Sequence, residues 1–379
     1  MAKRRLLVII VTASFVLVDL DLEFLAGGRG LNPASVAMFV TLAAASVAIH
    51  STSRPVVLLP RQVVVLLLWV LVATPFGVHP GRSLVAWLLL VAAAMTGSNR
   101  EHAASAPATV WGIWLGSFLI TAASIVAEVF NVLGRSNGRL QGLTLEPNML
   151  GHLAGLGVVA AMLIARDNNY RVLASLPLFL YAILESETRT VWLALIVAIS
   201  ALAWTQSRLR LVALGVLVGL LIVIGGLDTS IADVARRSES ESLTELSGRV
   251  DIWRWSLANI LDRPVFGAGL ASGPTQLTTT GFDAGLSLAS ASSHSLPVDV
   301  ARETGLFGLV VATILLGAAL RTRNLLMVPL VAYLIVTALT MPMSGFAGLV
   351  TVAWFAVVAR GRPGAEDLTE PDTSVTTRV

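Results

Sequence analysis

The sequence predicts an all-α membrane protein with about twelve transmembrane helices and a long outer loop. Three observations predict this fold class. Of the 379 residues, 55% are hydrophobic, only 13% are charged, and long apolar runs recur along the chain. Soluble domains carry about 25% charged residues, so this chain has too little charge to cover a surface that faces water. Runs of about 20 apolar residues can cross a bilayer as helices. A cytosolic enzyme is therefore excluded.

Twelve apolar runs, separated by charged residues, glycine and proline, are the predicted spans. Each run is rich enough in apolar residues to form a helix that faces lipid or other helices. Their approximate ranges are 6–25, 31–50, 62–77, 83–98, 107–130, 148–165, 172–186, 190–205, 210–227, 294–319, 325–341 and 345–359.

Basic residues predict the orientation of the bundle. If the end that carries Lys3 is cytoplasmic, fourteen basic residues fall in cytoplasmic segments and five in short outer loops. Lysine and arginine concentrate in cytoplasmic loops, so both termini are predicted to lie in the cytoplasm and the protein in the cytoplasmic membrane. The basic surplus is explained by topology and indicates no nucleic-acid partner. The predicted organisation is nine spans in 1–227, a long outer loop in 228–293, three spans in 294–361 and a disordered cytoplasmic tail in 362–379.

The long outer loop contains one predicted helix. Apolar residues such as Trp253, Leu257 and Ile260 recur at helical spacing, which predicts an amphipathic helix over 249–262. Pro264 ends this helix and Gly267-Ala-Gly269 turns the chain. The helix either lies on the surface of the outer leaflet or packs on the outer ends of the spans, and the two arrangements are compatible.

His294 is the first candidate for chemistry, because it stands where the long loop re-enters the membrane. An imidazole there could accept a proton from an attacking hydroxyl, or it could simply cap the next helix. Ionisable residues follow within the first turns of that helix, where charge is costly unless it faces a cavity or is paired. Asp299 and Arg302 could pair with each other, and Glu303 is the remaining acidic group. Gly305 and Gly308 are most simply read as sites of close helix packing.

The outer arginines are the second group of candidates, because guanidinium groups bind diphosphates through bidentate, charge-assisted hydrogen bonds. Each of them could instead contact lipid headgroups or nearby acids, and Glu185 and Glu187 flank the first of them. The group comprises Arg189 in the turn Glu185-Ser-Glu-Thr-Arg-Thr190, Arg249 at the start of the predicted amphipathic helix, and Arg135 and Arg139 in a glycine-rich segment that precedes Glu146.

No metal or nucleotide site is predicted. The chain has no cysteine, and no outer Asp-x-Asp pair stands ready to hold a divalent cation beside a phosphate. It also lacks a Walker A loop and a dinucleotide-binding fingerprint. We therefore expect no cofactor.

These motifs together resemble the O-antigen ligase and polymerase superfamily. His294-Ser295, followed after nine residues by Gly305-Leu-Phe-Gly308, is similar to the histidine motif of that superfamily. Ser186-Glu-Thr-Arg189 is similar to the arginine signature of an earlier outer loop. The pattern in the large loop is similar as well, and its parts are Ser247-Gly-Arg-Val-Asp-Ile-Trp253, Pro264 and Gly267-Ala-Gly269, with Glu146-Pro-Asn148 as a further family segment.

The resemblance implies a metal-independent glycosyltransferase of the GT-C type. Such an enzyme takes a glycan from undecaprenyl diphosphate on the outer face of the membrane and attaches it to a hydroxyl of a glycan or lipid acceptor. His294 would then position or activate the acceptor hydroxyl, while Arg189 and Arg249 would bind the donor diphosphate. Secondary candidates are Arg135, Arg139, Glu146 and Glu303.

Two other functions stay open at this stage. A polymerase of the same superfamily would add glycan blocks to a growing chain in place of transferring a finished one. A polysaccharide or lipid transporter would use intramembrane charges such as Asp299 and Glu303 as part of its pathway. Apart from donor, acceptor and membrane lipids, the partners expected for an enzyme are other envelope glycan-assembly proteins.

Overall fold

The computed structural model describes most of the predicted bundle as helix. The described residues are 2–15, 44–45, 59–97, 108–130, 135–136, 138–144, 147–205, 255–270, 272, 295–320, 327–340 and 349–360. The predicted spans at 31–50 and 210–227 lie outside them, apart from residues 44–45. Helices lie at the other ten predicted positions, which agrees with the helical fold class.

Most described helices begin and end within about four residues of the predicted limits, while the span predicted over 6–25 is described only as far as residue 15. Where an apolar run contains an internal proline, as at Pro75 and Pro177, a short 3₁₀ segment accompanies the α-helix. The elements are α1 Ala2–Ser14, α4 Arg61–Ala73, η2 Thr74–Phe76, α5 Pro80–Gly97, α6 Ala108–Val129, α7 Pro147–Ala165, η3 Tyr170–Ser175, α8 Leu176–Glu185, α9 Arg189–Thr205, α14 Leu296–Leu320, α15 Val328–Thr340 and α16 Leu349–Arg360. Residues 255–262 are also helical.

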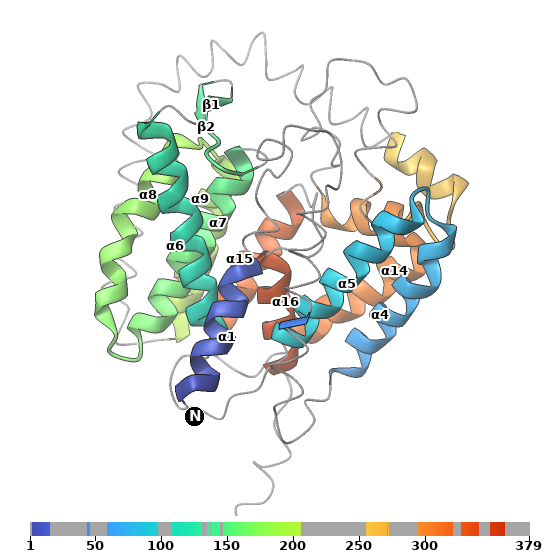
Figure 1. Cartoon of the computed structure of the whole chain (residues 1–379), viewed down its shortest axis with the longest axis horizontal. Helices are drawn as coiled ribbons and strands as arrows, with labels where there is room; N and C mark the ends of the chain where they lie inside the picture. Colours follow the sequence, from blue (N-terminus) through green and yellow to red (C-terminus); the bar gives the residue numbers. More distant parts are fainter. Residues whose placement is uncertain are drawn as a thin grey trace, which may run out of the picture.

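Two groups of helices flank a central set (Figure 1). Helices α6 to α9 form one group, and α4, α5 and α14 form the other, with α1, α15 and α16 between them. Contacts across the bundle agree with this view, because α15 packs on α9, α1 on α6, α16 on α5 and α14 on α4. The strands β1 and β2 and residues 255–262 lie at the end of the bundle opposite the N-terminus, which we call the hairpin end.

Helix α7 is the core of the first group. It contacts α6, α8, α9 and α15, and nearly all of its side chains are buried. Glycines allow its neighbours to approach closely: a Cβ at Gly155 would collide with the Tyr333 hydroxyl, and one at Gly157 would collide with the Phe179 ring. Small residues at helix contacts are the usual way to bring membrane helices together, because lipid supplies no hydrophobic force between them.

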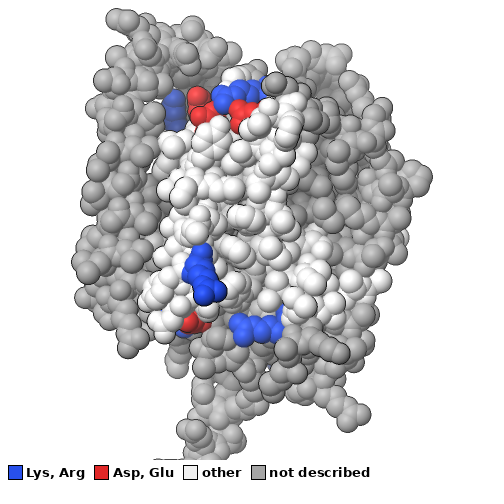
Figure 2. All heavy atoms as spheres, turned by 60° about the vertical axis from the view of Figure 1, so that its left-hand side comes forward, with Lys and Arg blue, Asp and Glu red and all other residues white. Residues whose placement is uncertain are grey.

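The described surface fits a membrane. Helices α6, α7 and α14 are long and apolar enough to cross a bilayer, and five further helices are apolar but shorter. Leu68, Leu119 and Leu193 are each at least half exposed, although full burial of a leucine is worth about 1.5–3 kcal/mol relative to water. Figure 2 shows an uncharged band between charged groups near the two ends of the bundle. The chain is a membrane protein.

A short hairpin was missing from the predicted all-α fold. Strand β1, Arg135–Ser136, pairs antiparallel with β2, Arg139–Leu140, and Ser136 lies opposite Arg139. The connecting dipeptide is Asn137-Gly138, and Gly138 has a φ of 80°. Asn-Gly is the strongest local indication of a two-residue hairpin turn, because both turn positions take positive φ. The dipeptide could have predicted this hairpin.

Helix α14 also differs from the prediction, because it is broken near its middle. Gly305 has a φ of 74° and a ψ of 178°, which no helical residue adopts. The close packing expected at Gly305 is present, because a Cβ there would overlap the Val265 carbonyl, but this glycine also breaks the helix. A Cβ at Gly308 would collide with the side chain of Thr304, so this second glycine is needed beside the break.

Candidate functional site

Arg189 is the first residue of α9 and is exposed at the hairpin end. The turn before it is held from within. Ser186 and Thr188 are buried, and the Thr188 hydroxyl lies 3.1 Å from the Ser186 hydroxyl. Glu187 between them takes the left-handed conformation, with a φ of 49°. This turn directs its two hydroxyls inward and leaves the guanidinium of Arg189 at the surface.

The position of Arg189 favours an anion. The start of a helix carries a partial positive charge, so a cation there is on the unfavourable end of the helix dipole. The first turn of α9 contains no acidic residue that would offset it. An anion at this point would interact with both the guanidinium and the free backbone N–H groups of the helix.

Arg139 connects the hairpin to the turn that carries Arg189. Its Nε donates to the Ser186 carbonyl over 2.8 Å, and its Nη2 donates to Asn148 Oδ1 over 2.7 Å. Asn148 is the second residue of α7, so one guanidinium joins β2, α7 and the α8–α9 turn. The structure thus gives Arg139 protein partners and a bracing role in the site.

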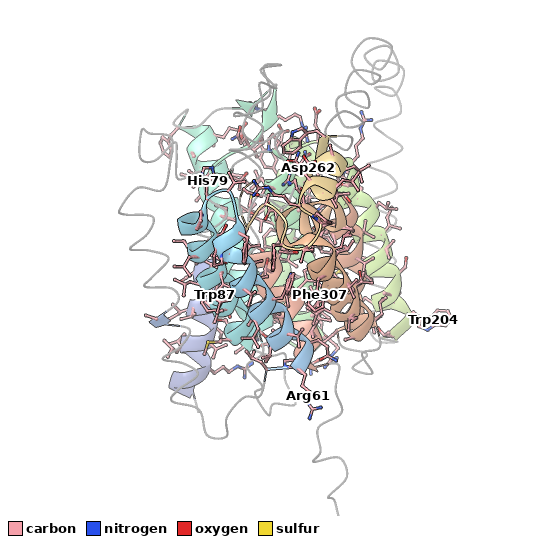
Figure 3. The ribbon with its side chains drawn as sticks, turned by 90° about the vertical axis from the view of Figure 1, so that its right-hand side faces the viewer. Arg61, His79, Trp87, Trp204, Asp262 and Phe307 are labelled. Atoms are coloured by element: carbon pink, nitrogen blue, oxygen red, sulfur yellow. The ribbon has the colours of Figure 1, made fainter. Side chains whose placement is uncertain are left out.

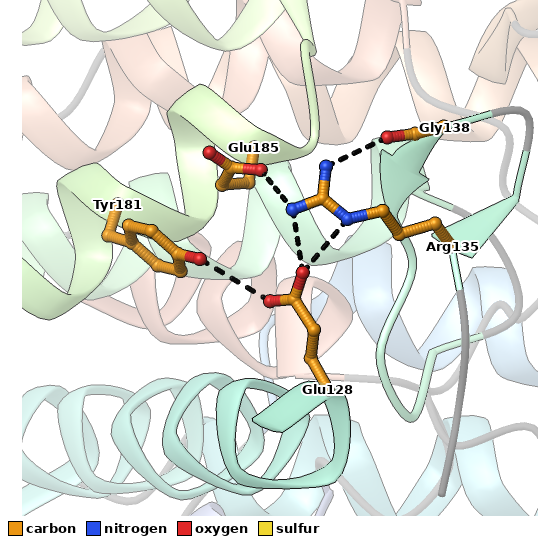
Figure 4. A network of polar contacts seen from close by, with 5 residues as sticks. All are labelled: Glu128, Arg135, Gly138, Tyr181 and Glu185. Atoms are coloured by element: carbon orange, nitrogen blue, oxygen red, sulfur yellow. Dashed lines mark hydrogen bonds and ion pairs between the residues drawn. The ribbon is translucent and has the colours of Figure 1, made fainter. Parts of the chain in front are cut away.

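Arg135 of the hairpin lies in a cluster of charged side chains together with Glu128 and Glu185 (Figure 4). Its guanidinium donates to Glu128 Oε1 over 2.6 and 2.9 Å and to Glu185 Oε2 over 2.5 Å. A further hydrogen bond reaches the Gly138 carbonyl, and the Tyr181 hydroxyl donates to Glu128 over 3.4 Å. The hydrogen bonds that Arg135 donates to Glu128 and then to Glu185 raise the pKa of Arg135 above its ordinary value. The carboxylates of Glu128 and Glu185 therefore already balance the positive charge of Arg135.

This cluster bears on the alternative explanation for Arg189, which was an ion pair with Glu185 or Glu187. Glu185 binds Arg135 instead. Within the described residues, no ion pair is found between Arg189 and either glutamate. The structure therefore brings Arg135, Arg139 and Arg189 to one place and gives them different surroundings. Arg135 and Arg139 bind protein groups, whereas no ion pair is found for the exposed Arg189 within the described residues.

The structure describes the region around His294 only from the next residue, Ser295, onward. His294, Arg249 and Glu146 lie outside the described residues. Arg302 and Asp299 form the expected ion pair, with Nη2 3.1 Å from Oδ1, and Glu303 Oε1 lies 3.3 Å from the same nitrogen. All three side chains are almost fully buried. Trp255 covers the guanidinium, with its ring centre 5.5 Å from Cζ.

Sequence reasoning gave no role to His152, which proves to be fully buried in α7. Its Nε2 lies 3.2 Å from the Thr190 hydroxyl, and its Nδ1 lies 3.5 Å from the Thr337 hydroxyl. The Tyr333 hydroxyl donates to its carbonyl oxygen. His152 therefore links α7 to α9 directly beside Arg189, and to α15. No local pattern predicted this, because the partners come from distant parts of the chain.

Comparison with known families identifies the region that contains these motifs. Residues 173–313 match the family model described as O-antigen ligase. This match covers less than half of the chain and makes that region similar to the O-antigen ligases. The matched region contains the Arg189 turn, residues 255–270 and α14 as far as residue 313, including its break. By position it contains Arg249 and His294 as well. Together with the apolar helices, the match supports a membrane protein that is similar to the O-antigen ligases. No curated protein matched the chain.

The described part of the chain contains no cluster of side chains typical of a metal site. Within those ranges, no three histidine, aspartate or glutamate side chains gather into a group that could hold a metal ion. The acidic residues found near the arginines bind guanidinium groups instead.

Proposed function

We propose that the protein transfers a glycan from undecaprenyl diphosphate to an acceptor hydroxyl, and that the hairpin end faces the outside of the cytoplasmic membrane. The acceptor oxygen forms a bond to the anomeric carbon of the sugar as the bond from that carbon to the diphosphate oxygen breaks. The hydroxyl proton leaves to a base, and undecaprenyl diphosphate is released. Direct attack inverts the anomeric centre.

The observation that carries this proposal is the exposed Arg189 at the start of α9, inside the region that matches the O-antigen ligases. A diphosphate leaving group gains negative charge as its bond to the sugar breaks. A helix start with a cation beside it is suited to stabilise this charge, because the helix dipole is oriented before the reaction begins. Arg139 and Asn148 support the role by bracing the turn.

His294 and Arg249 complete the proposed site on the strength of the sequence motifs. His294 positions the acceptor hydroxyl or takes its proton, and Arg249 shares the diphosphate with Arg189. Glu146 and Glu303 remain secondary candidates. The carboxylate of Glu303 is buried against Arg302. Holding donor and acceptor together at a membrane surface supplies much of the remaining rate enhancement.

The test uses the purified protein in liposomes that contain a glycan on a polyprenyl diphosphate. We expect carrier diphosphate to be released only when an acceptor is added. Arg189→Ala should lower kcat/KM for the donor at least about tenfold, because a charge-assisted bidentate contact is lost. Arg189→Lys should recover part of the activity, since it keeps the charge but loses the planar fork.

Arg171→Ala is the matched control, because Arg171 is an exposed arginine in η3, away from the hairpin end. It should behave like the unchanged protein. Movement of intact lipid-linked glycan without its cleavage would contradict the proposal in favour of a transporter. Product length separates the two enzyme types: a single transferred glycan indicates a ligase, and a ladder indicates a polymerase.

A further inference from the structure

The break in α14 is filled by a loop from another part of the chain. Residues 264–269, which contain the Gly267-Ala-Gly269 motif, lie against the break at Gly305. Leu306 N donates to the Pro264 carbonyl over 2.8 Å, Ala268 N donates to the Arg302 carbonyl over 2.8 Å, and Gly269 N donates to the Glu303 carbonyl over 2.9 Å. Backbone groups freed by the break thus bind the loop. This satisfies the requirement that broken helices in membranes find new partners for their polar backbone.

The fit between loop and break explains the glycines of both motifs. A Cβ at Gly305 would overlap the Val265 carbonyl, and a Cβ at Gly267 would lie 2.6 Å from the Gly305 nitrogen and the Glu303 oxygen. Gly267 and Gly305 also have positive φ values of 69° and 74°. Two motifs that lie far apart in the sequence therefore form one close contact between backbones.

Trp69 of α4 also contacts the residues around the break. Its Nε1 donates to the Thr304 carbonyl over 2.8 Å, the last carbonyl before Gly305. Its ring stacks on Phe266 of the loop, with centres 5.4 Å apart, and contacts Phe307 just beyond the break, with centres 4.4 Å apart. Figure 3 shows Phe307 at about mid-height of the bundle, below the end that carries His79 and Asp262.

The segment of α14 before the break, residues 296–304, is a short helix with its own internal charges. Asp299 lies in its first turn and Arg302 near its end, so both charges are favourable for the helix dipole. The ion pairs of Arg302 with Asp299 and Glu303 lie within this segment, and Trp255 covers them from the preceding helix. The segment is therefore held at its end by the loop and Trp69, and along its length by a buried charge cluster.

We propose that residues 295–304 are a rigid mount for His294, which immediately precedes them, and that Trp69 is a positioning residue for the transfer reaction. This inference depends on the proposed role of His294. Trp69 acts by fixing the inner end of the mount through the Thr304 carbonyl. A displacement of about 1 Å between reacting groups can cost about 100-fold in rate. A small tilt of this segment would therefore lower the rate of the transfer step.

Trp69→Phe tests the proposal, because it removes the N–H donor and keeps an aromatic ring. We expect kcat to fall about tenfold while the KM for the donor changes less than about twofold, since the diphosphate contacts are elsewhere. Trp87→Phe is the matched control: Trp87 Nε1 also donates to a backbone carbonyl over 2.8 Å, that of Leu67 within the α4–α5 pair. Both variants lose one such hydrogen bond, so equal losses of thermal stability are expected.

A distance measurement gives a readout that does not depend on activity. The chain has no cysteine, so spin labels can be attached at Ser295→Cys on the mount and Glu187→Cys in the α8–α9 turn. The distance distribution should broaden in Trp69→Phe and not in Trp87→Phe. If the two variants have the same kcat, the proposal is wrong whatever the distances show. A fully active His294→Ala protein would instead refute the role of His294, and the distances would still report whether Trp69 holds the segment.

Discussion

At the scale of single residues, the hairpin end contains two arginines that bind protein groups and a third, Arg189, for which no ion pair is found within the described residues. Arg135 and Arg139 lie close in sequence and both resembled diphosphate ligands. The former binds two carboxylates, and the latter binds a carbonyl and an amide oxygen. Arg135 also affects Arg189 indirectly, because it binds Glu185, four residues before Arg189. Glu185 is then less able to compete with an anionic ligand for the Arg189 guanidinium.

This arrangement predicts the effect of Arg135→Ala. The change leaves Glu185 and Glu128 without their cation, and the negative charge near Arg189 rises. We expect the KM for the lipid diphosphate donor to increase about three- to fivefold, which corresponds to about 1 kcal/mol for an exposed charge interaction. Steady-state kinetics at low ionic strength is the measurement, because salt screens such effects.

The double variant Arg135→Ala/Glu185→Gln separates this electrostatic effect from damage to the hairpin. Removal of the Glu185 charge should return the donor KM most of the way to its original value. If the double variant is as weak as Arg135→Ala alone, the loss comes from the structure of the hairpin and the explanation by charge is incorrect.

At the scale of elements, long apolar runs predicted the helices well, because burial in lipid requires them. Helices α6 and α7 begin and end within one residue of the predicted 107–130 and 148–165. The break in α14 was not predicted, since the run through Gly305 is as apolar as an unbroken helix and the loop that fills the break comes from residues 264–269. The partners of Arg135 and Arg139 were missed for the same reason, because they lie on α6, α7 and the α8–α9 turn.

Two glycines of α14 offer a direct test of the break. Gly305→Ala forces an unfavourable positive φ and drives a Cβ into the Val265 carbonyl, so we expect a loss of about 3 kcal/mol or more in stability. Gly317→Ala in the same helix meets no atom within 4 Å and should be neutral or stabilise by up to about 1 kcal/mol. Thermal unfolding in detergent compares them. Equal stability would show that α14 can form without the break.

At the scale of the whole molecule, the fold places two differently built sites at one end of the bundle. The α8–α9 turn is braced against α7 and the hairpin, while the outer part of α14 is held by the 264–269 loop and α4. The central helices join these two halves: α15 packs on α9 and also contacts α14, α7 and α16. The candidate residues on the two halves are therefore held in a constant relation by the helices between them.

The side of the membrane on which this end lies is the last prediction. Asp262 and Arg61 are both exposed and lie at opposite ends of the bundle (Figure 3). Because the chain has no cysteine, Asp262→Cys and Arg61→Cys each provide a single thiol. In intact cells, a membrane-impermeant thiol reagent should label Asp262→Cys, and it should label Arg61→Cys only after permeabilisation, as positive residues favour the cytoplasm. The reverse pattern would place the hairpin end inside the cell, where Arg189 could not meet a donor presented on the outer face, and the proposed function would fail with it.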